Sequence, residues 1–128
     1  MNKPGRLSET EMEVMQTIWE LATPVTVAQL LAIFEESKHW KTSTLSTILA
    51  RLIDKGFLTK EMKGKVNFYD INLTLKEYQK YEAQSLLATL YGGSVKSFVA
   101  ALVDDEIVSR ADIDDLRQWF QDKAGDGL

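Results

Sequence analysis

Basic side chains are concentrated in one short stretch of this 128-residue sequence. Seven of its 15 basic residues lie between positions 38 and 65, with only two acidic residues among them, so this stretch carries a net charge of +5 within a chain of formal net charge −4. The stretch also contains Thr42-Ser43-Thr44 and Thr47. Lysine and arginine bind phosphate, and serine and threonine hydroxyls donate to phosphate oxygens and base edges. This chemistry indicates a nucleic-acid interface in a protein that is acidic overall.

The hydroxyl-bearing residues fall on one side of a helix that we predict over residues 42–55. Leucine or isoleucine recurs at positions 45, 48, 49, 52 and 53, a spacing that forms one apolar stripe. The positions outside the stripe are small or hydroxyl-bearing and nearly free of acid, unlike an ordinary solvated face. We predict that this helix reads bases and that nearby lysines hold phosphate. The candidate DNA contacts are Lys41, Thr42, Ser43, Thr44, Thr47, Arg51, Lys55, Lys63 and Lys65.

The elements expected around this helix define a fold. Capping boxes that begin at Ser8 and Thr26 predict two helix starts, and Gly64 with its neighbouring lysine predicts a tight turn between two strands. The predicted helices cover about residues 9–21, 27–37 and 42–55, and the predicted strands cover 57–62 and 65–71. Three helices followed by a β-hairpin are typical of the winged helix-turn-helix, a mainly α fold with a small β element.

The last third of the sequence predicts three short amphipathic helices, the first beginning at a capping box at Thr74 and the next two after Ser94 and Ser109. So few residues cannot bury all of this apolar surface among themselves, and symmetric self-association is the simplest way to cover it. We therefore predict a winged helix DNA-binding domain over residues 1–73 and a helical dimerisation domain over residues 74–128. The predicted dimer contacts are Leu86, Leu87, Leu90, Tyr91, Phe98, Val99, Leu102, Ile113, Leu116, Trp119 and Phe120.

The sequence gives little support for an enzyme, a metal-binding protein or a membrane protein. There is no cysteine, and His39 is the single histidine, so no catalytic triad or thiolate or histidine metal cluster is expected. Acidic runs near residues 104 and 112 are typical of helix ends. We predict no enzyme activity, no cofactor and no metal. The polar amino terminus and the absence of a long apolar run predict a cytoplasmic protein without a membrane segment. A winged helix protein-interaction module remains the alternative function, with the basic stretch as a solvated face.

Four parts of the sequence carry motifs that are typical of one protein family. They are residues 7–15 with Ile18-Trp19, residues 39–45, residues 49–56, and residues 63–65 with Tyr69. This set resembles the penicillinase repressor family of bacteria, which includes the methicillin-resistance and copper-transport repressors, and the resemblance covers about residues 7–123. It implies a homodimeric transcriptional repressor that binds dyad operators of the TACA...TGTA kind through its winged helix domain and dimerises through its C-terminal helices.

The sequence departs from that family pattern at three places. The usual Ser-Pro-Lys at the start of the recognition helix is replaced by Lys41-Thr42-Ser43. In the β-lactam-responsive members a sensor protease cuts an Asn-Phe bond, and the aligned residues here are Ala101-Leu102, so the resemblance raises such a protease as a partner without matching its site. The copper-responsive members bind metal through paired Cys-x-Cys motifs, which excludes that mode of sensing for a chain without cysteine.

Overall fold

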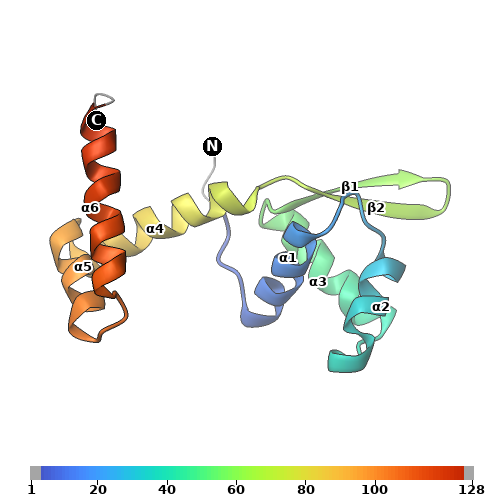
Figure 1. Cartoon of the computed structure of the whole chain (residues 1–128). Helices are drawn as coiled ribbons and strands as arrows, with labels where there is room; N and C mark the ends of the chain where they lie inside the picture. Colours follow the sequence, from blue (N-terminus) through green and yellow to red (C-terminus); the bar gives the residue numbers. More distant parts are fainter. Residues whose placement is uncertain (1–3, 126–128) are drawn as a thin grey trace. The chain divides into compact units, whose positions relative to one another are not determined.

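The computed structural model describes residues 4–125, and these form six helices and one hairpin (Figure 1). In chain order the elements are α1 (Glu9–Glu20), α2 (Val27–Lys38), α3 (Thr42–Asp54), β1 (Leu58–Lys63), β2 (Val66–Ile71), α4 (Leu75–Tyr91), α5 (Val95–Asp104) and α6 (Arg110–Gly125). The chain divides into two compact units, which meet inside α4 after Lys80. The predicted element order and the mainly α class are therefore confirmed.

The first two helices begin at the predicted capping boxes. At α1 the Ser8 hydroxyl accepts from the Glu11 amide at 3.2 Å, and the Glu11 carboxylate accepts from the Ser8 amide at 2.7 Å. At α2, Thr26 and Gln29 exchange the equivalent bonds at 3.2 and 2.8 Å. Such reciprocal bonds satisfy amide groups that a helix leaves without partners. The helix-turn-helix then follows because α2 ends at Lys38 and its C-cap His39, with a left-handed φ of 55°, turns the chain into α3.

The core of the first unit lies between α1, α2 and α3 and extends under the hairpin. The apolar stripe predicted for α3 is almost entirely buried there, whereas its last member, Ile53, is partly buried. The core consists of Val14, Met15, Ile18, Val25, Leu30, Phe34, Leu45, Ile48, Leu49, Leu52, Phe57, Leu58, Tyr69, Leu73 and Tyr78. At its centre the Phe57 ring lies 5.2 Å from the Tyr78 ring, which stacks on Trp19 at 5.6 Å. Burial of the stripe leaves the opposite face of α3 in solvent.

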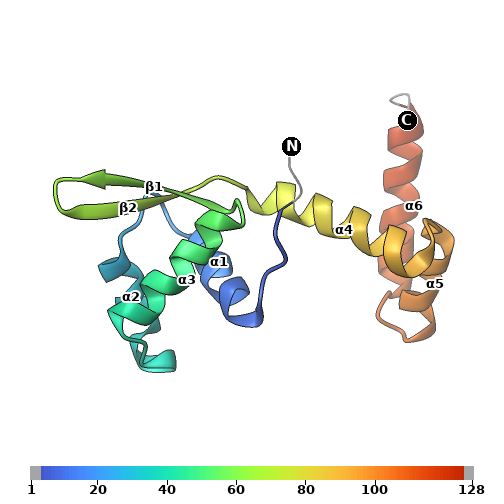
Figure 2. The same cartoon turned by 180° about the vertical axis from the view of Figure 1, so that it is seen from behind.

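The hairpin pairs β1 and β2 antiparallel, with Leu58 opposite Ile71 and Lys63 opposite Val66. A third short segment joins it, because Val25 and Tyr69 exchange two backbone hydrogen bonds of 2.9 and 2.7 Å. The first strand begins one residue later than predicted. Phe57 stays outside it because its carbonyl accepts from the amides of residues 72 and 73, which close the base of the hairpin. Seen from behind, α3 and the hairpin lie on the near side of this unit (Figure 2).

The second unit contains the end of α4 together with α5 and α6. Its helices start where the sequence predicted: the hydroxyls of Ser94 and Ser109 accept from amides three residues later, both at 3.1 Å. Its packing is very different from that of the first unit, because no residue between 81 and 125 is buried. The rings of Tyr91 in α4 and Phe98 in α5 lie 5.2 Å apart within it.

Within residues 4–125 no single helix is long and apolar enough to cross a bilayer. Only α4 and α5 taken together reach that length and composition, and they are bent by 89° relative to one another.

Candidate nucleic-acid interface

The predicted base-reading residues occupy the solvent-facing side of α3. Thr42, Ser43, Thr44, Thr47 and Arg51 are all exposed, opposite the buried stripe of the same helix. The Thr47 hydroxyl donates to the Ser43 carbonyl at 2.9 Å, so its oxygen remains able to accept. In the part of the chain that the structure describes, Arg51 forms no ion pair with a carboxylate. This side of α3 therefore presents hydroxyl groups and the guanidinium of Arg51 to solvent.

The start of α3 differs from the starts of α1 and α2. Lys41 occupies its N-cap and provides no side-chain hydrogen bond, and its first turn contains no acidic residue. The amide groups of that first turn therefore lack the side-chain partner that α1 and α2 supply to theirs. Unpartnered amides at a helix start attract anions, and the ammonium of Lys41 and the hydroxyls of Thr42 and Ser43 add to this attraction. The arrangement suits a DNA backbone phosphate.

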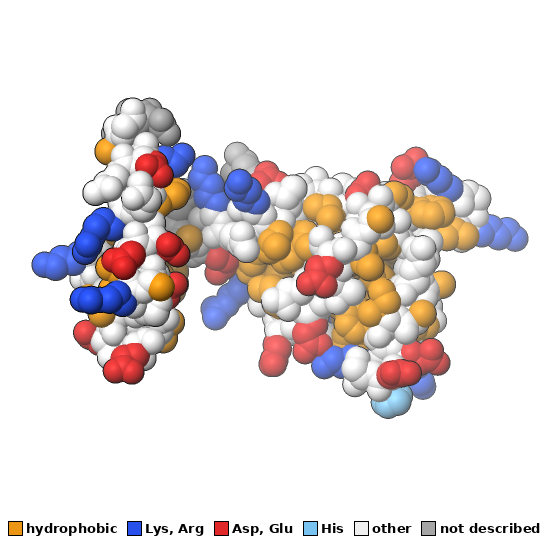
Figure 3. Space-filling model, in the orientation of Figure 1, with side chains coloured by type: hydrophobic (Ala, Val, Ile, Leu, Met, Phe, Trp, Pro, Cys, Tyr) orange, Lys and Arg blue, Asp and Glu red, His pale blue; other side chains and the backbone are white. Residues whose placement is uncertain are grey.

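The tip of the hairpin carries a second group of cations. Lys63 and Lys65 flank the turn at Gly64 and are exposed, and Lys and Arg side chains are visible at this tip in Figure 3. The Lys63 ammonium lies 5.6 Å from the centre of the Phe68 ring, which restricts where it projects. Lys60 is exposed as well, but it lies three positions before Lys63 on β1, opposite Tyr69 and away from the turn.

A surface hollow of about 440 Å³ runs along the exposed side of α3. It brings together three predicted residues, Thr44, Thr47 and Arg51, with the start of α1 and with Trp40. The Trp40 ring packs against Phe34 at 4.9 Å, so this wall of the hollow is anchored to the core. The full lining is Ser8, Thr10, Glu11, Trp40, Thr44, Thr47, Ile48 and Arg51. Sequence reasoning missed the contribution of α1, because no local pattern relates segments more than 30 residues apart.

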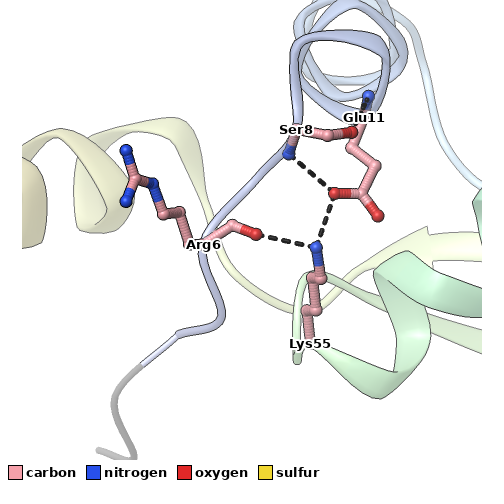
Figure 4. A network of polar contacts seen from close by, with 4 residues as sticks. All are labelled: Arg6, Ser8, Glu11 and Lys55. Carbon is pink, nitrogen blue, oxygen red and sulfur yellow. Dashed lines mark hydrogen bonds and ion pairs between the residues drawn. The ribbon is translucent and has the colours of Figure 1, made fainter.

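Lys55, the remaining predicted phosphate contact, lies in a different environment. Its ammonium donates to Glu11 Oε1 at 2.6 Å and to the Arg6 carbonyl at 2.7 Å (Figure 4). Glu11 is only 2% exposed. Burial alone would raise the pKa of Glu11, but hydrogen bonds from Lys55 and Ser8 and the charge of Lys55 outweigh it and lower the pKa from its usual 4.5. Lys55 therefore differs from the other eight candidate DNA contacts, because its ammonium binds a carboxylate and a carbonyl of the protein itself.

The acidic residues do not gather into a metal site. Among residues 4–125 no three histidine or acidic side chains lie close enough together to hold a metal ion. Asp112 instead caps α6: it accepts from the Ser109 amide at 2.9 Å, and hydrogen bonds from Ser109 lower its pKa.

The fold and the exposed face of α3 place this chain among the winged helix-turn-helix proteins. Residues 7–122 match the penicillinase repressor family, and the chain belongs to that family. It is 28% identical to the penicillinase repressor of Bacillus licheniformis, with 95% of this chain and 94% of the relative covered. It is also 28% identical to the methicillin resistance regulatory protein MecI of Staphylococcus aureus strain N315, at 95% and 98% coverage.

Solved structures agree with this assignment. The solution structure of the DNA binding domain of the repressor BlaI is similar to this chain with a TM-score of 0.52 and 31% identity, and the match covers 61% of this chain and 94% of that chain. The Bacillus licheniformis BlaI monomeric form in complex with the blaP half-operator matches with a TM-score of 0.50, at the same identity and coverage. The predicted family and fold class are confirmed.

Proposed function

We propose that this protein is a bacterial transcriptional repressor, active in the cytoplasm, that binds a dyad-symmetric operator of the TACA...TGTA kind as a homodimer. The observation that carries the proposal is the exposed side of α3, which combines hydroxyl and guanidinium donors with unpartnered amides at the helix start. A family relative of the same fold, BlaI, is solved in complex with a half-operator. Repression then follows from occupancy of the operator and needs no catalytic group.

Each part of the interface has a distinct role in this proposal. Thr44, Thr47 and Arg51 read base edges in the major groove, because they lie on the exposed side of α3. The start of α3 and the hairpin lysines Lys63 and Lys65 hold backbone phosphates on either side. The basic character of this surface overcomes the negative charge of the chain, since attraction to DNA depends on the field at the contacting face.

A second copy of the chain would cover the apolar surface of the second unit. Leu90, Leu116, Trp119 and Phe120 are exposed there, although they are large apolar side chains. A hollow of about 580 Å³ lined by Asp112, Asp115, Leu116 and Trp119 offers a place for an apolar group of the partner. Such surfaces are typical of interaction sites. We propose that residues 74–128 form the dimerisation domain and residues 1–73 the DNA-binding domain.

Dimerisation explains how a small winged helix domain reaches useful affinity. Two recognition helices that engage the half-sites of one dyad act at a high effective concentration. Separation of the dimer, by whatever signal, would therefore release the operator. Proteolysis at Ala101-Leu102 is one such route, but these residues lie inside α5, and its backbone would have to open before a protease could cut there.

The experiment that tests this function compares three DNA duplexes. A fluorescent TACA...TGTA duplex, a single half-site and a scrambled duplex are each titrated with the full chain at two salt concentrations. We expect two chains to bind the dyad, weaker binding to the half-site, and a steep loss of affinity at the higher salt. Equal binding to the dyad and scrambled duplexes would refute the proposed operator. Absence of duplex binding at physiological salt would favour the protein-interaction alternative.

A further inference from the structure

Lys55 joins the amino-terminal segment to the end of α3 through both its side chain and its backbone. Its ammonium donates to the Arg6 carbonyl, and its own carbonyl accepts from the Gly5 amide at 3.2 Å. The approach is close: a Cβ atom at Gly5 would lie 2.7 Å from Lys55 Cγ. The Arg6 side chain points away from Lys55, so only its backbone takes part (Figure 4). The segment is therefore packed against α3 at a defined position.

The carboxylate of the ion pair between Lys55 and Glu11 is buried, unlike the carboxylate of the ion pair between Lys38 and Glu13. The Glu11 side chain is 2% exposed and the Lys55 side chain 31%, whereas Glu13 and Lys38, 2.8 Å apart, are 37% and 36% exposed. Removing the cationic partner of a buried carboxylate is costly because it leaves that charge without compensation. If Lys55 moved to a DNA phosphate, the Glu11 carboxylate would keep only its hydrogen bonds at Ser8. The contacts therefore favour Lys55 staying on Glu11.

The position of this pair connects it to base reading. Lys55 is the C-cap of α3, one turn beyond Arg51, and Glu11 lines the same hollow as Thr44, Thr47 and Arg51. The pair thus fixes the end of α3 against the start of α1 across the wall of the hollow. The other end of α3 has no side-chain cap, whereas this end is held by the ion pair and by the hydrogen bonds of Lys55 with residues 5 and 6.

We propose that Glu11 and Lys55 are a positioning pair that sets the orientation of α3 for sequence-specific binding, and that Lys55 is not a phosphate ligand. This inference rests on the proposed function, since it requires DNA on the exposed side of α3. Misplacing a reading helix weakens base contacts, which need defined geometry, more than it weakens general attraction to phosphate.

The test measures dyad and scrambled duplexes separately for Lys55→Met, Glu11→Gln and the double variant. Far-UV circular dichroism and urea titration give the folded fraction, by which each affinity is corrected. Lys76→Met is the matched control for the lost positive charge, because Lys76 is exposed at the start of α4, outside the proposed interface. Glu13→Gln is the control for the lost carboxylate, on the same helix as Glu11. Lys55→Arg keeps a cation and tests for rescue.

We expect Lys55→Met and Glu11→Gln each to reduce the preference for the dyad over the scrambled duplex by roughly tenfold, the value of one good base contact. The double variant should lose no more than either single one, Lys55→Arg should retain most of the preference, and the salt dependence should stay unchanged. Uniform weakening on both duplexes, with the salt slope reduced by about 0.9, would make Lys55 a phosphate ligand and overturn the proposal.

Two further outcomes would also overturn the positioning role of the Glu11–Lys55 pair. Variants that keep the full preference after correction for folded fraction show that the pair serves stability alone, which overturns the positioning role while the proposed function stands. Wild-type protein that shows no preference for the dyad refutes the proposed operator, and this inference falls with it. The wild-type measurement alone therefore distinguishes the two failures.

Discussion

Replacing Trp119 by alanine should weaken the proposed dimer strongly. Its side chain is 50% exposed in the single chain, with its ring 5.1 Å from Phe120 and the Lys123 ammonium 5.6 Å from its centre. A tryptophan buries roughly 200 Å², so about 100 Å² remains for a partner to cover. At about 25 cal/mol/Å² this is ~2.5 kcal/mol per chain and ~5 kcal/mol per dimer, an upper limit because an interface covers such a surface incompletely.

Converted to affinity, this limit corresponds to a dimer dissociation constant raised by roughly 4,000-fold, and half coverage to a rise of roughly sixtyfold. Sedimentation equilibrium over a range of concentrations measures the constant directly. Ile33→Ala is the matched control, because Ile33 is 47% exposed on α2, in the other unit. Circular dichroism confirms that α6 remains helical in the variant. Binding to a half-site duplex should stay unchanged, while binding to the dyad weakens along with the dimer.

The reasoning would be refuted by a Trp119→Ala protein that dimerises as well as wild type and is as helical. In that case the exposed surface of α6 is not the dimer contact, and the area estimate has been applied to the wrong face. A loss of dimer in Ile33→Ala would be equally damaging, because it would place the interface on the first unit.

Three further predictions concern the first unit. Arg51→Ala should weaken dyad binding by about 1 to 3 kcal/mol in a duplex titration, and unchanged affinity would remove Arg51 from the interface. Phe57→Ala should lower the free energy of unfolding, measured in urea, by about 3 to 5 kcal/mol, because Phe57 is fully buried against Trp19 and Tyr78. A loss below about 1 kcal/mol would contradict this packing. Glu11 has a lowered pKa, so its contribution to stability is present above its usual pKa of 4.5 and is lost as the pH falls from there through the lowered pKa of the folded protein. The stability gap between wild type and Glu11→Gln should therefore shrink as the pH falls below 4.5, and a constant gap would argue against the Lys55 pair.

Helix starts were the features that the sequence predicted best. Ser8, Thr26, Ser94 and Ser109 all cap helices in the structure, because capping depends on residues only three positions apart. The exposed side of α3 was predictable for a similar reason: a period of 3.6 residues assigns each position to the buried or the solvent side once the apolar stripe is known.

Contacts between segments that are far apart in the chain could not be predicted from the sequence. Lys55 has the same local signature as Lys41, a lysine at one end of the reading helix, and both were predicted to hold phosphate. Only the fold brings Glu11 within 2.6 Å of one of them, across 44 positions in the chain. The hollow beside α3 was missed for the same reason, since Thr10 and Glu11 enter it from another helix.

The two ends of α3 differ in their contacts with the rest of the first unit. Its end is held by the protein, through a buried carboxylate, a lysine and the backbone of residues 5 and 6. Its start has no side-chain cap and offers its amides and the Thr42 and Ser43 hydroxyls to solvent. A proline in the first turn would remove one of those amides, so the Lys41-Thr42-Ser43 sequence leaves one more donor available for phosphate than the usual family sequence does. The protein thus fixes α3 at one end and leaves the amides at its other end available to a phosphate, as the proposed function requires.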